Sequence, residues 1–146
     1  MKFPPQWMNC LWLMLPLLIW NMVLGPRLTD PRITSDANSP KWLLIAENML
    51  RMLIFALPLL IPLRVESPVQ KIGLVGYIAG TLIYFSSWLP LWLAPHSAWS
   101  NSAIGLLVPR ITPLLPFLGV ALIGVSWSYG VMALLFVLMH TWHGLQ

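Results

Sequence analysis

Long apolar runs separated by short polar stretches dominate the pattern of the chain. A helix that spans about 30 Å of hydrocarbon needs roughly 20 apolar residues, so runs of that length are candidate transmembrane helices. Four such runs lie at about residues 7–24, 42–63, 72–94 and 114–139. The stretches between them are rich in Pro, Ser, Asn and charged residues, as is typical of loops. The pattern therefore predicts an all-α fold: a bundle of four transmembrane helices in a single domain over residues 1–146.

A proline-rich stretch precedes the last run. Pro109, Pro113 and Pro116 interrupt apolar sequence that begins at Ala103. Inside a helix, each proline removes a backbone donor and clashes with the preceding turn. We therefore expect residues 103–108 to form a short interfacial or re-entrant segment.

The composition excludes an ordinary water-soluble domain. Of 146 residues, 58% are hydrophobic and 8% are charged, whereas a typical soluble domain has about 25% charged residues. We expect an integral protein of the cell membrane, plasma or inner, with the lipid bilayer as its first partner. The net charge of +4 does not indicate nucleic-acid binding, because the Lys and Arg residues are scattered singly and no RNA- or DNA-binding motif accompanies them.

Tryptophan favours the headgroup level of a bilayer, so its positions test the arrangement of the helices. With four alternating helices, Trp20 and Trp42 lie at one membrane face, and Trp7 and Trp142 lie at the other. This arrangement puts both ends of the chain on the same side. Which side faces the cytoplasm stays open, because the basic residues are almost evenly divided between the two faces.

Small residues recur at helical spacing in two of the runs. Gly73, Gly76 and Gly80 share a face of the third run, and Ser126 and Gly130 begin a similar stripe in the fourth. Such residues allow helix backbones to approach closely in lipid. The stripes either pack against each other within the chain or form a homo-oligomer or a larger membrane complex.

The second run holds the most unusual polar group. Glu47 and Arg51 are four residues apart and share a helical face, with Asn48 beside them. The alternation of helices puts His96 at the same membrane face, so these four residues are our candidate binding site. Two interpretations remain: a proton-handling or anion-binding site, and an ion pair that fixes the register of the helices.

His140 and His143 are weak candidates for metal ligands, because they are three residues apart on a helix but lack a carboxylate motif. The four-helix arrangement places them at the face opposite His96 and Glu47. We therefore predict no metal and no cofactor. We identify no catalytic residue either, since the usual nucleophile and nucleotide-binding motifs are missing from the sequence.

Three functions are compatible with these features. The first, which the sequence favours because a bundle of about four helices leaves little room for a transport cavity, is a structural or accessory subunit that acts through helix packing in the bilayer. The second is a small proton-coupled or solute transporter that uses Glu47 and Arg51. A membrane-embedded enzyme is the weakest of the three, because no nucleophile accompanies the polar group.

Overall fold

The fold is all-α in the computed structural model, which describes residues 8–27 and 40–144. Its α-helices, in chain order, are α1 (Leu11–Leu24), α3 (Lys41–Ala56), α4 (Pro68–Leu93), α5 (Ala103–Ile111), α6 (Leu114–Ile123) and α7 (Trp127–His143). Two short 3-10 turns, η1 (Gly25–Arg27) and η2 (Leu57–Leu59), extend α1 and α3. The first three predicted runs correspond to α1, to α3 with η2, and to α4. Trp7, which was predicted to lie at a membrane face, is outside the described residues.

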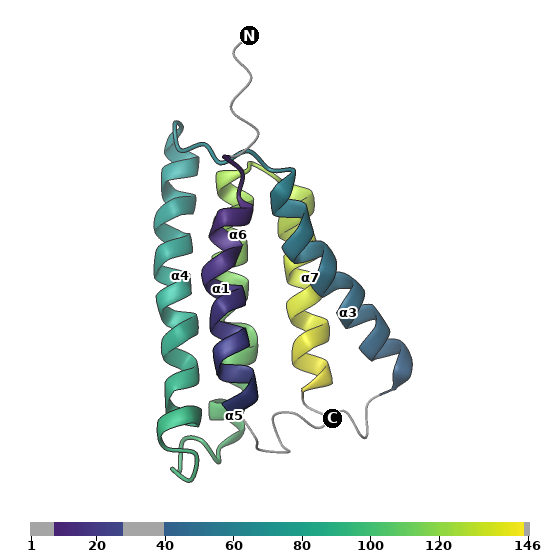
Figure 1. Ribbon diagram of the computed structural model, residues 1–146, viewed down its shortest axis with the longest axis vertical. Helices are drawn as coiled ribbons and strands as arrows, with labels where there is room; N and C mark the ends of the chain where they lie inside the picture. Colours follow the sequence, from purple (N-terminus) through teal and green to yellow (C-terminus); the bar gives the residue numbers. More distant parts are fainter. Residues whose placement is uncertain (1–7, 28–39, 145–146) are drawn as a thin grey trace.

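The helices lie side by side and run alternately up and down (Figure 1). α5 and α6 follow each other in the same direction, so that Ala103–Ile123 forms one rod of 21 residues. The described chain therefore makes five passes through the bundle. α1 begins at one end of the bundle, and α7 finishes at the opposite end.

The prediction of one helix over residues 114–139 is wrong, because the chain reverses direction after Ile123. Val125 has a φ of 48°, a left-handed conformation that is rare for a β-branched residue. Ser126 then caps the next helix, since its Oγ accepts a hydrogen bond of 3.3 Å from the backbone N of Tyr129. α6 and α7 consequently form an antiparallel hairpin, and a four-helix bundle becomes a five-pass bundle.

The prediction of an interfacial or re-entrant segment over residues 103–108 is also wrong, because α5 continues to Ile111 and leads into α6. Pro113 is the N-cap of α6, and Pro116 lies in its first turn. A backbone N–H would have no helical partner at these positions, so proline is tolerated there. Pro109 is inside α5. The prolines therefore divide one rod into two helices without turning the chain back.

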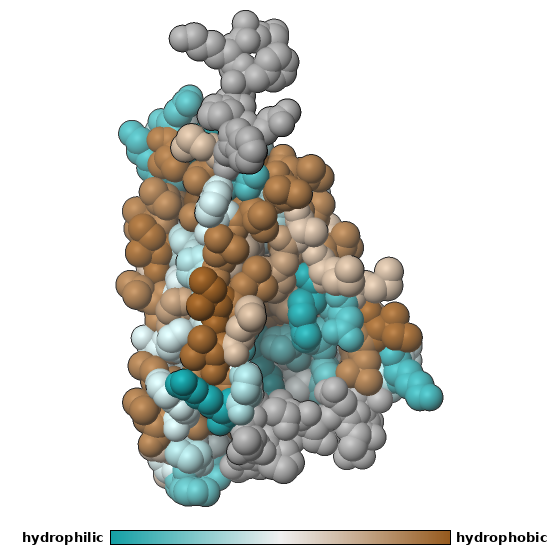
Figure 2. Space-filling view, in the orientation of Figure 1, coloured by the Kyte–Doolittle hydropathy of each residue, from teal (hydrophilic) through white to brown (hydrophobic). Residues whose placement is uncertain are grey.

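Three helical stretches are long and apolar enough to cross a membrane, namely Lys41–Leu59, Pro68–Leu93 and Ala103–Ile123. Leu11–Arg27 is apolar but shorter. Hydrophobic residues cover most of the outer face seen in Figure 2, which is uncommon for a water-soluble monomer. Length, composition and surface together suggest integration into a membrane.

The closest packing joins α4 to α6, and we call this contact the α4–α6 seam. It is lined by Gly73 and Gly80 of α4 and by Gly119 of α6. A Cβ on Gly119 would lie 2.6 Å from the backbone N of Tyr77, and one on Gly80 would lie 2.8 Å from that of Pro116. Since no real Cβ contact is that short, the seam needs glycine at these positions.

The remaining small residues singled out in the sequence lie elsewhere. Gly76 is exposed on α4, and a Cβ there would meet nothing within 4 Å. A Cβ on Gly130 would make an ordinary contact of 3.5 Å with Ala121 Cβ across the α6–α7 hairpin. Ser126 precedes α7 as its cap and is not part of a helical stripe.

Two tyrosines of α4 connect it to α1. The hydroxyl of Tyr77 donates a hydrogen bond to the carbonyl of Leu13, and that of Tyr84 donates to Asn21 Oδ1 at 2.6 Å. Tyr77 and Tyr84 are both buried. α1 is therefore held in place by directed polar contacts rather than by a close glycine seam.

The prediction that Trp42 and Trp142 lie at opposite membrane faces is wrong. Their rings meet edge to face with centroids 6.2 Å apart. The hairpin after α6 explains this contact, because the additional pass brings the end of α7 to the level where α3 begins.

Candidate functional site

Glu47 is the centre of the most polar group inside the bundle. It lies in the first half of α3, and only 1% of its surface is exposed. Its carboxylate accepts hydrogen bonds from Arg51 on the same helix and from His140 and His143 on α7. We call these four residues the Glu47 cluster.

The two histidines approach the carboxylate from one face of α7. His140 Nδ1 lies 2.9 Å from Glu47 Oε1, and His143 Nδ1 lies 2.5 Å from Oε2. Each carboxylate oxygen therefore has its own imidazole N–H donor. The ring of His140 also stacks on Phe136, with centroids 5.6 Å apart and an angle of 11° between the planes, and this contact fixes the ring's orientation.

The prediction that His140 and His143 lie at the face opposite Glu47 is wrong, for the same reason as the tryptophan assignment. A single helix over residues 114–139 would have carried them away from the start of α3. The reversal at Val125 returns them to it. The histidines that seemed least relevant to Glu47 are thus its partners.

The other two members of the predicted site do not join Glu47. Asn48 is exposed on α3, and His96 is exposed in the turn that follows α4. In the described part of the chain, the hydrogen-bond partners of the Glu47 carboxylate are Arg51, His140 and His143, and neither Asn48 nor His96 is among them. Of the four predicted residues, the structure brings together Glu47 and Arg51.

The cluster is not arranged as a metal centre. Among the described residues, no group of three or more His, Cys, Asp or Glu side chains is placed to hold a metal ion. In the Glu47 cluster, the histidine nitrogens point at the carboxylate oxygens and not at a common point between them. The chemistry that this arrangement supports is proton exchange between a carboxylate and imidazoles, and neutralisation of a buried charge.

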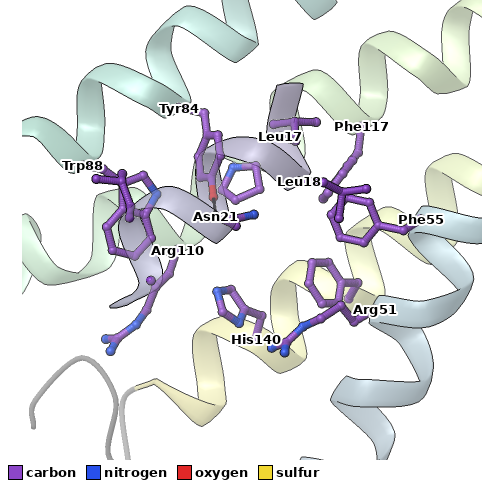
Figure 3. A pocket seen from close by; sticks show the side chains of 14 residues that line it. Leu17, Leu18, Asn21, Arg51, Phe55, Tyr84, Trp88, Arg110, Phe117 and His140 are labelled. Atoms are coloured by element: carbon purple, nitrogen blue, oxygen red, sulfur yellow. Dashed lines mark hydrogen bonds between the residues drawn. The ribbon is translucent and has the colours of Figure 1, made fainter. Parts of the chain in front are cut away.

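A cavity of about 370 Å³ adjoins the cluster. Three basic side chains, Arg51, Arg110 and His140, contribute to its wall. Its aromatic and amide lining comprises Asn21, Phe55, Tyr84, Trp88, Phe117 and Phe136. Figure 3 shows aromatic rings around the upper part of the pocket and the nitrogens of Arg51, His140 and Arg110 along the lower part.

Arg110 is a functional candidate that the sequence reasoning left out of the site. Only 6% of its surface is exposed, and it interacts electrostatically with Glu47. A Cβ on Gly144 would overlap its guanidinium group, so the residue after α7 lies directly against it. The signal was available, because a cation inside an apolar run is by default a functional candidate in a membrane protein.

The carbonyl of Ile54 also has a defined role. Pro58 cannot donate to it, and the buried hydroxyl of Tyr129 donates to it instead, at 3.1 Å. This bond joins α3 to α7 at a deeper level than the Glu47 cluster. The two helices are therefore held together at two heights, by a neutral hydrogen bond and by a charged cluster.

Comparison with known proteins gives no further guide, because no protein family, no curated protein and no solved structure matches the chain.

Proposed function

We propose that this chain is an integral protein of the plasma or inner membrane that moves a solute together with protons, and that the Glu47 cluster binds the proton. The observation that carries the proposal is the burial of Glu47 among three basic side chains from two helices. Histidine is the side chain best suited to exchanging protons near neutral pH. A carboxylate with two imidazole partners can therefore gain and lose a proton without leaving the bundle.

The contact with the cavity favours this function over a purely structural ion pair. Arg51 and His140 belong both to the Glu47 cluster and to the wall of the pocket. When Glu47 or a histidine changes its charge, the electrostatic potential in the pocket changes with it. An ion pair that only fixed helix register would need a partner on α7, but it would need no contact with the pocket.

A pH jump applied to reconstituted protein tests the proposal. In vesicles adsorbed to a capacitive electrode, proton binding inside the protein produces a transient current. We expect this current from the native protein and from Glu66→Gln, which removes an exposed carboxylate at the other end of the bundle. We expect Glu47→Gln to abolish it, because the amide keeps the shape of the carboxylate but does not titrate in this range.

Folded yield, measured by gel filtration, separates the alternatives. Normal yield of Glu47→Gln with loss of the current supports proton handling. A current that is unchanged in Glu47→Gln, or absent from the native protein, overturns the proposal. If Glu47→Gln does not fold, His140→Gln retains the carboxylate, and we expect it to reduce the current.

One observation favours a second candidate, a structural or accessory subunit. Gly76 has open space beside it, and it lies among exposed apolar residues of α4 such as Ile72 and Val75. A helix of a second copy or of another subunit could approach closely there. Oxidative cross-linking of Gly76→Cys in native membranes tests this, with Ile78→Cys as the control; the native Cys10 is buried and gives little background. A cross-link to a second chain specific to Gly76→Cys supports the accessory function, and a monomer contradicts it.

A further inference from the structure

From the cavity beside the Glu47 cluster we infer a ligand class: the pocket binds an amphipathic anion, with its phosphate or carboxylate head at Arg51 and His140 and its apolar part against the aromatic wall. This inference deepens the proposed function, on which it rests, by naming the chemistry of the solute. It stands on the shape, polarity and charge of the pocket.

The polarity of the pocket changes from one end to the other. In Figure 3, Phe55, Phe117 and Tyr84 surround the upper part, and the side-chain nitrogens of Arg51 and His140 lie at the lower part. Pockets of this kind orient a ligand with a few polar groups and hold it with apolar contact. A ligand with one charged end and one apolar end matches both parts.

The charge of the surroundings selects an anion. The described charged residues at this end of the bundle are Arg27, Lys41, Glu47, Arg51 and Arg110, four cations and one carboxylate. Concentration of one sign of charge around a cleft raises the local concentration of ligands of the opposite sign.

Arg51 is able to reach a ligand while it contacts Glu47. Its side chain is 47% exposed, whereas that of Glu47 is 2% exposed. A guanidinium group carries five N–H donors, and the contact with Glu47 uses the Nη2 group. Donors therefore remain for an oxyanion in the pocket, and charge-assisted hydrogen bonds of this type are roughly twice as strong as neutral ones.

The size of the pocket sets the size of the bound part. Ligand pockets usually measure about 300–1,000 Å³, so a volume of about 370 Å³ suits a headgroup with a short apolar portion. Figure 2 shows a hollow between α1 and α3 with hydrophilic residues inside it. A longer chain could leave through this opening, so the anion is either a small solute or the head of a membrane lipid.

Thermal unfolding in decyl maltoside tests the ligand class. The probes are octyl phosphate, octyl glucoside with the same tail but no charge, octyltrimethylammonium with the opposite charge, and inorganic phosphate with no tail. We expect octyl phosphate to raise the melting temperature in a saturable manner, and the other three to have little effect.

Two arginine variants locate the binding. In Arg51→Gln we expect octyl phosphate to bind about tenfold or more weakly, as expected for loss of a hydrogen bond to a charged group. In Arg64→Gln, which changes an exposed arginine at the opposite end of the bundle, we expect native affinity. Equal stabilisation by octyl phosphate and octyl glucoside, or native affinity in Arg51→Gln, overturns the inference.

Native mass spectrometry distinguishes the two sources of the anion. A copurifying adduct with the mass of an acidic phospholipid, lost in Arg51→Gln, identifies a lipid headgroup. Binding of octyl phosphate without such an adduct identifies a free solute. Both results support an amphipathic anion.

The same measurement separates this inference from the proposed function, because binding in detergent needs no proton movement. We expect Glu47→Gln to bind octyl phosphate at least as tightly as the native protein, since its loss frees Arg51. Binding without any pH-jump current would overturn proton-coupled transport and leave the pocket assignment standing. A pH-jump current without octyl phosphate binding would overturn the pocket assignment and leave proton-coupled transport standing.

Discussion

Along the α4–α6 seam, a Cβ on Gly73, Gly80 or Gly119 would come within 3 Å of the facing helix. In the interior of the bundle, by contrast, side chains of all the helices border a cavity of about 370 Å³, and a hollow lies between α1 and α3 on the surface (Figure 2). Glycines at the seam allow the two backbones to come into contact. Large aromatic side chains border the cavity, but they do not fill it. Close packing supplies much of the stability of a helix bundle in lipid, so the seam can keep the fold together while the other side stays open for a ligand.

The largest loss of unfolding free energy is expected from a substitution that disrupts the α4–α6 seam. Gly119→Leu places a side chain against the backbone N of Tyr77, which cannot move without shifting α4. We expect a loss of about 3 kcal/mol of unfolding free energy, the upper part of the range for overpacking. Unfolding by SDS titration in micelles measures it. The matched control is Gly76→Leu, whose site is open; similar losses in both would show that the seam is not what makes Gly119 necessary.

A smaller loss of unfolding free energy is expected when either of two buried tyrosine hydroxyls, those of Tyr129 and Tyr84, is removed. Tyr129→Phe leaves the Ile54 carbonyl without a donor, because Pro58 cannot supply one. We expect a loss of about 1–2 kcal/mol in the same titration. Tyr84→Phe should lose about 0.5–1 kcal/mol, since Asn21, its acceptor, lines the cavity and can bind water there. The reverse order would contradict the view that the α1–α3 side is the open one.

The smallest effect on stability comes from filling the cavity. Leu18 lines the pocket and is half-buried, so Leu18→Phe should change the unfolding free energy by no more than about 0.5 kcal/mol. The larger ring takes up space that the ligand needs, and octyl phosphate should therefore bind more weakly. A large destabilisation would mean that this side is as closely packed as the seam.

The all-α class and several local relationships followed from the sequence. The spacing of Glu47 and Arg51 placed both on one face of a helix, and they are in contact. Local spacing is reliable because it depends only on the geometry of one helix. Asn48 shows its limit, because a neighbour in sequence points to a different side of the helix and is exposed here.

The reversal at Val125 could not be read from hydrophobicity. Residues 114–139 are apolar on both sides of the turn, and the turn itself contains no charged residue and no proline. Gly124 followed by a Ser two residues later was the available signal, since Gly ends helices and Ser caps the next one. The error then spread, because in an alternating bundle one missed turn inverts the direction of every later helix. His140, His143 and Trp142 were all assigned to the wrong end for this single reason.

The position of the histidines in the chain also has a consequence in time. His140 follows Glu47 by 93 residues and His143 by 96. During synthesis, α3 is therefore complete long before α7 exists, and the nascent helix carries its carboxylate with Arg51 as the partner available on the same helix. The ion pair between Glu47 and Arg51 has no net charge, which lowers the free-energy penalty for inserting α3 into a bilayer. His140 and His143 reach the carboxylate only when α7 docks, and they then replace the water or lipid around it. The Glu47 cluster is thus complete only after α7 has docked, and the pocket beside it can bind its ligand only from that point on.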